Sequence, residues 1–365
     1  MQKIDVAAYV WPAYTGDEPR SRIFWEEGIG EWQSVKNSKE KSDGSYWHRK
    51  PLWGYVNEAD PSVMEMQIKE ALSHNVNVFI YDWYWYDDRP FLENCLNNGF
   101  LKAKNNEDMK FYIMWANHDA NYTWDIRNSH QHSTVVWQGA VSEAQFKNIG
   151  IRWIEQYFVK PNYYKIENRP LISIYDMQNF ISGLGGIEKA KENMAWLDEK
   201  CREYGFCGVH FQFVKWGCNP LNLSGVDGDV KEVTPQIAKE LGFLSLTHYQ
   251  FVHFLNVTKP YPELLPDLKA EYEKISKNFE IPYFPHVSIG WDNNPRFKEP
   301  HGPVLPESNP ENFEKALVIA KEYAENNNVP MVTVNSWNEW TESSYLEPDD
   351  LFGYGYLDAI KRVFG

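Results

Sequence analysis

The chain has 365 residues, 43% of them hydrophobic and 24% charged, which is enough for a sizeable core in one large domain or two ordinary ones. Its formal net charge of −15 argues against charge-driven binding to nucleic acid or to an anionic membrane surface. Because no apolar run reaches the length of about 18 residues that a membrane span needs, we expect no transmembrane helix. We expect a cytoplasmic protein, or a periplasmic or secreted one whose leader has been removed.

Short β-rich runs recur along the chain, each followed by a polar loop. They are rich in Val, Ile, Phe and Tyr, and their first halves are largely apolar. Such runs are typical of parallel strands that are buried on both faces. The pattern predicts eight strands, at 4–10, 77–85, 110–117, 169–175, 207–214, 243–251, 283–291 and 330–337.

Helical periodicity fills most of the intervals between these strands. Asp60 and Pro61 provide a cap and a first-turn proline for a helix over 61–74, and Ser142 begins another that runs to 158. The segment between the fifth and sixth strands is the poorest helix candidate. Further helices are expected at 186–205, 262–279, 309–326 and 354–364.

Strands that alternate with helices, with no composition break, predict an α/β fold in which residues 1–365 form a single (β/α)₈ TIM barrel. The alternative is a doubly wound open sheet, which usually has a glycine-rich first βα turn that WPAYTGD lacks. Long βα loops are expected over the C-terminal face. The polar and aromatic loop from Pro12 to Pro61 is expected to fold over the barrel mouth.

Polar and aromatic residues gather at the C-terminal ends of the predicted strands, where barrel active sites form. Aromatic faces stack on sugar rings, and carboxylates and amides bind hydroxyl groups, so we expect a glycan-binding mouth. The candidate substrate-binding residues are Asp82, Trp85, Trp115, Asn117, His118, Tyr249, Trp291, Asp292 and Asn338. Other residues at these ends are Trp11, Asp119, Tyr175, Asp176, Gln212, Lys215 and Trp216.

The sharpest motif is NSWNEWTESSYLEPD at 335–349, in which Glu339 and Glu342 lie among tryptophans. Acetal hydrolysis needs a proton for the leaving oxygen and a base, and paired carboxyls in a partly apolar site can serve both roles. Spacing alone fits a solvated acidic loop equally well. Glu347 is interpreted as a structural partner.

We expect no metal and no other cofactor. The four cysteines, one of which is Cys218, form no CxxC pair and no zinc spacing, and the lone HxH of His130 and His132 has no counterpart on the first strand. His210 and His286 lie within apolar strands and are interpreted as core histidines.

The segment WNEWTESSYLEPD followed by YGYL resembles the C-terminal signature of the WbsX-like proteins, which are often labelled glycosyltransferases. It also resembles the NEWHEG-type motif of the endo-α-mannosidase and endo-α-1,2-mannanase family, glycoside hydrolase family 99. Further matches to the WbsX-like pattern are FIYDWYW at 79–85, MWAN at 114–117, RPLISIY at 169–175 and GWDNNPR at 290–296.

The resemblance implies a (β/α)₈ barrel and glycan chemistry without a metal or nucleotide cofactor. Carried over, Glu339 is the base on the substrate's 2-hydroxyl, which attacks the anomeric carbon to give a 1,2-anhydro sugar, and Glu342 is the general acid/base. Two departures leave the sugar open. VWPAYTGDEPR replaces the usual Pro-Gln-Phe-His-Pro segment, and His118 replaces a usual Glu.

The leading hypothesis is therefore a glycoside hydrolase acting on an oligo- or polysaccharide, with Glu339 and Glu342 as the catalytic pair. A glycosyltransferase would need a nucleotide-sugar site, and the sequence has no glycine-rich phosphate loop or clear basic cluster, only the weak DxD-like Asp87 and Asp88. A non-catalytic glycan-binding barrel explains the aromatic residues but not the paired glutamates. Sugar, linkage and oligomeric state stay open.

Overall fold

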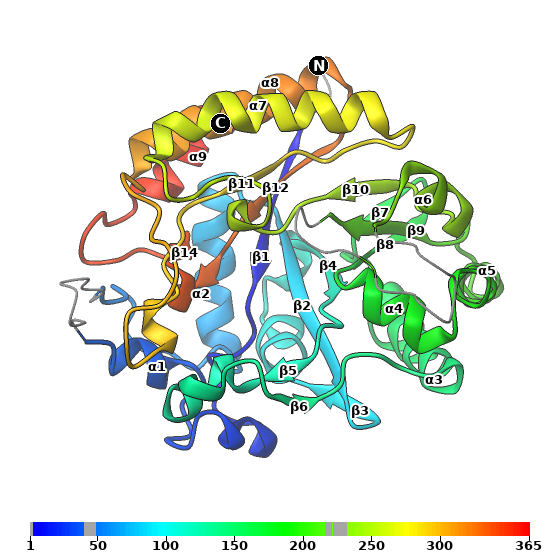
Figure 1. Ribbon diagram of the computed structural model, residues 1–365, viewed down its shortest axis with the longest axis horizontal. Helices are drawn as coiled ribbons and strands as arrows, with labels where there is room; N and C mark the ends of the chain where they lie inside the picture. The colour runs from blue at the N-terminus through cyan, green and yellow to red at the C-terminus, as the bar shows by residue number, and fades with distance from the viewer. Residues whose placement is uncertain (1–2, 40–48, 216–220, 222–231) are drawn as a thin grey trace.

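Eight parallel strands form the centre of the molecule (Figure 1). The computed structural model describes residues 3–39, 49–215, 221 and 232–365. All eight predicted strands are present, and most are shorter than the sequence pattern suggested. They are β1 (Asp5–Val10), β2 (Val78–Tyr86), β4 (Lys110–Trp115), β8 (Arg169–Ile174), β9 (His210–Val214), β10 (Ser245–Thr247), β11 (His286–Ser288) and β12 (Met331–Asn335).

The strands run in the order β10-β9-β8-β4-β2-β1-β12-β11. The ring closes between its two ends through backbone bonds of Leu246, whose N–H donates to the Pro282 carbonyl (3.0 Å) and whose carbonyl accepts from Phe284 (2.8 Å). The predicted TIM barrel is confirmed. The carboxyl ends of all eight strands therefore open onto one face, where their loops can build a site.

Helices surround this barrel, as the periodicity predicted (Figure 1). The poor helix candidate between the fifth and sixth strands is a seven-residue helix, α6 (Pro235–Leu241). Asp60 caps α2 through the Ser62 N–H, and Ser142 begins α3 with a capping box to Gln145. The remaining long helices are α2 (Pro61–Ser73), α3 (Glu143–Trp153), α4 (Met177–Leu184), α5 (Ile187–Glu203), α7 (Tyr261–Asn278), α8 (Pro310–Asn326) and α9 (Gly355–Phe364).

Many core side chains carry polar groups, and the two predicted core histidines bond to hydroxyl groups there. His210 bonds to the Ser245 hydroxyl, and His286 bonds to the hydroxyls of Thr333 and Ser288. Both are confirmed as core histidines. Trp216 and Cys218 lie outside the described residues. Over the described ranges, no helix combines the length and the apolar character required to cross a bilayer.

The described part of the loop after β1 packs over the barrel mouth, as predicted. It contains α1 (Trp32–Lys36), and its Trp25 ring contacts Trp11 and Trp124. Gly30 has φ +61°, and a Cβ there would lie 1.8 Å from the Ala13 carbonyl oxygen. Glycine is therefore required at this close approach, which delivers the next residue, Glu31, to the barrel mouth.

Candidate active site

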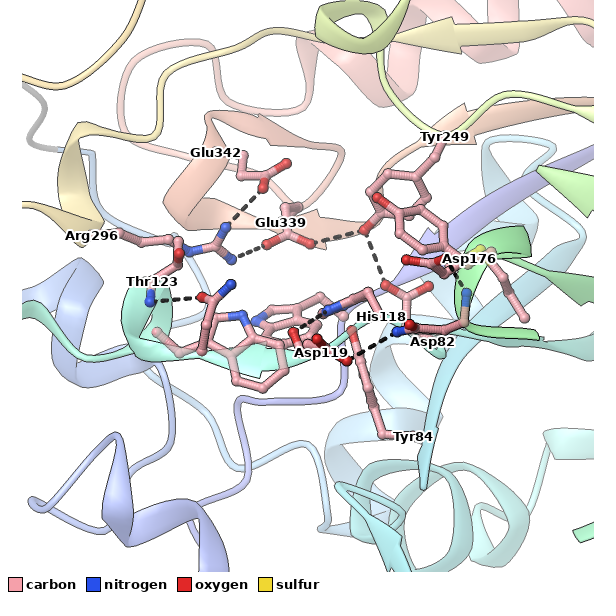
Figure 2. A pocket seen from close by; sticks show the side chains of 17 residues that line it. Asp82, Tyr84, His118, Asp119, Thr123, Asp176, Tyr249, Arg296, Glu339 and Glu342 are labelled. Atoms are coloured by element: carbon pink, nitrogen blue, oxygen red, sulfur yellow. Dashed lines mark hydrogen bonds and ion pairs between the residues drawn. The ribbon is translucent and has the colours of Figure 1, made fainter. Parts of the chain in front are cut away.

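A cavity of about 380 Å³ opens at the carboxyl ends of the strands, and Figure 2 shows the side chains around it. The charged groups that line it come from different strands and from the loops that follow them, as in other barrels. Aromatic side chains, among them Trp11, Tyr84 and Trp124, complete the wall. The lining acids are Asp82, Asp119, Asp176, Glu339 and Glu342, and the lining base is Arg296.

Arg296 joins the two motif glutamates (Figure 2). Its Nη2 donates to Oε1 of Glu339 at 2.6 Å and its Nη1 donates to Oε1 of Glu342 at 2.7 Å. Because both bonds come from one planar guanidinium, the two carboxyls are held in a fixed relation beside the cavity. Of the two glutamate side chains, Glu339 is 3% exposed and Glu342 is 13% exposed, so Glu342 is the more accessible.

Glu31 holds Arg296 from the other side. Its Oε1 accepts from Arg296 Nε at 2.9 Å, and its Oε2 accepts from the Trp11 indole at 2.5 Å. Burial alone would lower the pKa of Arg296, but the charges of Glu31, Glu339 and Glu342 outweigh it and raise that pKa well above its usual value. The guanidinium is therefore a permanent cation at this site.

Tyr249 links Glu339 to Asp82 across the cavity floor. Its hydroxyl lies 3.0 Å from Oδ2 of Asp82 and 3.2 Å from Oε2 of Glu339. A hydroxyl has one proton, so it donates to one of these carboxyls at a time. The other Asp82 oxygen, Oδ1, is buried and has no hydrogen-bond partner among the described residues.

Burial raises the pKa of both glutamates. For Glu339 the charge of Glu342 adds to this effect and Arg296 opposes it. For Glu342 the Arg296 charge opposes burial, and the Gln250 amide also favours the ionised form. Burial raises the pKa of Asp82 well above its usual value too, against the Tyr249 hydrogen bond. Several buried carboxyls share one guanidinium, and their raised pKa values favour retention of protons among them.

The opposite wall carries His118, Asp119 and Asp176. Oδ1 of Asp119 accepts from the Gly139 N–H (2.8 Å) and the Asn179 amide (3.0 Å), and Oδ1 of Asp176 accepts from the Asn179 N–H (2.8 Å). Burial raises the pKa of Asp176 to about 6, and burial lowers the pKa of His118. His118 is therefore neutral at pH 7 and leaves the aspartate charges uncompensated.

The sequence profile of the family described as Glycosyltransferase WbsX matches residues 6–360, almost the whole chain. The chain belongs to the WbsX family. The WxcX proteins of two Xanthomonas campestris pv. campestris strains are each 24% identical to it over 350 residues, which are 94% of this chain and 47% of theirs. This WbsX-family chain thus spans about half the length of the curated relatives that it matches.

Solved structures share its barrel. The GH99 endo-α-mannosidase from Bacteroides thetaiotaomicron is 14% identical with a TM-score of 0.60, covering 100% of this chain and 96% of that one. A glycoside hydrolase-like protein is also 14% identical, with a TM-score of 0.63 and coverage of 100% and 94%. At these identities the likeness shows the fold, in agreement with the resemblance drawn from the motifs.

The structure brings five of the predicted residues of this WbsX-family chain together around the cavity. They are Glu339, Glu342, Asp82, His118 and Tyr249. It does not bring Trp85 and Trp115 there. Successive side chains of a strand alternate between faces, so Trp85 lies on the face opposite Asp82, where it stacks on Trp83. Trp115 packs against helix residues in the outer layer.

The two predicted asparagines brace loops instead of facing the cavity. Asn117 exchanges hydrogen bonds with the backbone of Asp176, at 2.7 Å in each direction. Asn338 does the same with the backbone of Trp11 and also donates to Glu58. Their amides are committed to these bonds, so they position neighbours of the site residues.

Trp291 and Asp292 are also absent from the described cavity lining. The Asp292 carboxylate accepts from the N–H and side-chain amide of Asn294 (3.0 and 2.8 Å), two residues before Arg296. The Asp292 N–H donates to the Glu342 carbonyl. Asp292 thus ties the Arg296 segment to the loop that carries Glu342.

Sequence reasoning missed Arg296 and Glu31 as site residues. Arg296 ends the GWDNNPR segment, and Glu31 lies 265 positions away in the loop after β1. The available signal for Arg296 was its charge: it is an arginine just after the seventh predicted strand, and several other predicted strands end in acidic residues. Glu31 had no signal, since nothing in its sequence neighbourhood marks it.

A second buried acid pair lies behind the same loop. Glu58 and Glu347 share the Gln67 amide at 3.2 and 2.8 Å, and the Glu347 carboxylate accepts from the Trp340 indole at 2.6 Å. Burial raises the pKa of Glu347 well above its usual value and that of Glu58 to about 7. Neither residue lines the cavity. Glu347 is a structural partner, as predicted.

Proposed function

We propose that this chain is a glycoside hydrolase that cleaves an oligo- or polysaccharide, with Glu339 and Glu342 as its catalytic pair. One observation carries the proposal: two carboxyls with raised pKa values are bound to one guanidinium at the edge of an aromatic-lined cavity. Such a pair can hold a proton for a leaving oxygen and still offer a base.

The proposed reaction retains the anomeric configuration. Glu339 takes the proton of the 2-hydroxyl as that oxygen attacks the anomeric carbon, while Glu342 gives its proton to the leaving oxygen. Glu342 then takes a proton from water as the water oxygen opens the 1,2-anhydro ring, and Glu339 returns its proton to the 2-oxygen. Protons balance over the two steps. The greater exposure of Glu342 supports its assignment to the leaving group and water.

The family description favours a second candidate, a glycosyltransferase using a nucleotide sugar. The charge of the cavity counts against it. A sugar diphosphate is bound by cations or by backbone N–H groups of a helix start or glycine-rich loop. Five acids and one arginine are the charged groups of the described lining, and that arginine is already paired with three carboxylates.

The test is release of reducing ends from a broad glycan panel by the intact chain, alongside Glu339→Gln and Glu342→Gln. We expect cleavage of at least one glycan, slowed by roughly 10²-fold or more in either variant. Circular dichroism checks that both variants are folded. Binding without cleavage across the panel, wild-type rates in a variant changed at both positions, or tight binding of sugar nucleotides with transfer would contradict the proposal.

A further inference from the structure

The cavity is acidic well beyond the catalytic pair. Asp119 follows β4 and Asp176 follows β8, and in the strand order these two strands lie three and four places from β12, the strand that the glutamates follow. Four places is the opposite side of an eight-stranded ring. Asp82, on β2, lies between the two sides. A glycan that spans the cavity can therefore reach Asp119 and Asp176 with one sugar and Glu339 and Glu342 with the next.

Neutral groups fix these aspartates in place. The Asp119 and Asp176 carboxylates accept from backbone N–H groups and the Asn179 amide, and Asp82 accepts from the Tyr249 hydroxyl. Among the described residues, no Lys or Arg forms a salt bridge to any of the three. Hydrogen bonds to neutral donors position a carboxylate without cancelling its charge.

An unsatisfied buried oxygen points to a ligand at this wall. Asp82 lines the cavity, and its buried Oδ1 has no hydrogen-bond partner among the described residues. Asp82 is 3% exposed. A buried carboxylate oxygen without a partner is costly, and a donor from a bound molecule would remove that cost. A cationic donor fits best, because its charge would also hold Asp82, whose pKa burial raises, in the ionised form.

We propose that the substrate glycan carries a free amino sugar, whose protonated amine binds among Asp82, Asp119 and Asp176. An ammonium group offers three N–H donors and cancels charge, whereas a hydroxyl offers one donor and cancels none. This inference rests on the proposed function, since the amine belongs to the glycan that Glu339 and Glu342 cleave. It names the substrate class of the site, an amine-bearing oligosaccharide in which the amine is not acetylated.

The test measures binding, so it needs no turnover. The probes are methyl hexosides of the gluco, galacto and manno series with one amine at C2, C3, C4 or C6, each beside its hydroxyl parent and its N-acetyl derivative. Calorimetry with the intact chain at neutral pH gives the dissociation constants. We expect at least one amino sugar to bind about tenfold or more tightly than both matched compounds, and to lose that preference as salt is raised.

Variants test whether Asp119 and Asp176 cause the tighter binding of the amino sugar. In a chain carrying Asp119→Asn and Asp176→Asn, the preference should fall to about threefold or less. Asp267→Asn removes the same charge from α7, where Asp267 pairs with Lys259 on the surface, and should leave the preference unchanged. Should the double variant fail to fold, the single Asp119→Asn and Asp176→Asn chains are compared instead.

Three results would overturn the inference: no amino sugar binds more tightly than its hydroxyl parent, no probe binds at all, or the preference survives both asparagine substitutions. These outcomes separate it from the proposed function. Cleavage of neutral glycans without amine preference defeats this inference alone. Amine preference without cleavage of any glycan defeats the hydrolase proposal and leaves an amino-sugar binding site.

Discussion

Two buried acid pairs include residues of the segment that follows β12. One is Glu339 with Glu342, and the other is Glu347 with Glu58. Both pairs contain carboxyls whose pKa burial raises. They differ in their partners, because the first pair contacts Arg296 and the second contacts amides and an indole. They also differ in access, because the first pair alone is in the cavity lining.

This difference shows that a raised pKa by itself does not mark a catalytic carboxyl. Glu58 and Glu347 are buried and lie outside the described cavity lining. Its hydrogen bonds reach Trp340 and Asn338, the two neighbours of Glu339 in sequence. The second pair therefore supports the loop, while the first pair, with its cation and its opening, is the one placed to meet a substrate.

Removing the cation should have the largest effect. Arg296→Met leaves Glu31, Glu339 and Glu342 buried without their counter-charge, and breaking a buried ion pair costs roughly 3–5 kcal/mol. We expect a loss of that size in the free energy of unfolding, measured in urea at neutral pH. Lys259→Met breaks an exposed pair with Asp267 and should cost less than about 1 kcal/mol. Equal losses in the two variants would contradict the central place given to Arg296.

The second pair should reveal itself in the pH dependence of stability. Burial on folding raises the pKa of Glu58 from 4.5 to about 7, so the folded chain holds a proton that the unfolded chain releases. That stabilisation is complete below about pH 4.5 and is lost as the pH rises through about 7.

Glu58→Gln places a neutral amide where the protonated acid lies. Between pH 5 and 8, the free energy of unfolding of this variant should therefore fall by about 1–3 kcal/mol less than that of the wild type. Urea titrations at several pH values measure this difference. Parallel pH profiles for the two proteins would show that Glu58 does not hold the proton.

The smallest expected effects come from two tryptophan substitutions, one in the cavity lining and one on the face of β2 away from the cavity. Trp124 lines the cavity, and losing an aromatic contact of about 0.5–1.5 kcal/mol in Trp124→Leu should raise KM by roughly twofold to tenfold. Trp85→Phe changes a side chain on the face away from the cavity, so kcat/KM should change by less than about twofold. A larger effect of Trp85→Phe on KM would place that ring in the substrate path after all.

The sequence was sufficient for the barrel, because parallel strands buried on both faces appear as apolar runs at regular intervals. It was not sufficient for the direction of each side chain. All nine residues of β2 are buried, so no alternation of polar and apolar residues showed that Asp82 and Trp85 point to opposite faces. Asn117 and Asn338 were correctly predicted at strand ends, but their bonds to the backbone of other loops depend on tertiary structure.

The proposed catalytic pair was visible as two glutamates among tryptophans, whereas the groups that distinguish it from Glu347 come from elsewhere in the chain. Arg296 and Glu31 meet across 265 positions, and no local pattern announces such a contact. Asp119 and Asp176 were visible at predicted strand ends, but the hydrogen bonds that fix them, from Gly139 and Asn179, depend on tertiary structure.

The most direct test of the account compares two leaving groups in single-turnover experiments. Once the cleaved sugar is known, its aryl glycoside with an activated leaving group needs no acid, whereas the natural glycan does. With Glu342→Gln we predict a first-step rate near that of the wild type on the aryl glycoside and roughly 10²-fold or more below it on the glycan. With Glu339→Gln both substrates should be slow. Equal slowing of both substrates by Glu342→Gln, or full activity of either variant on the glycan, would contradict the roles assigned to this pair.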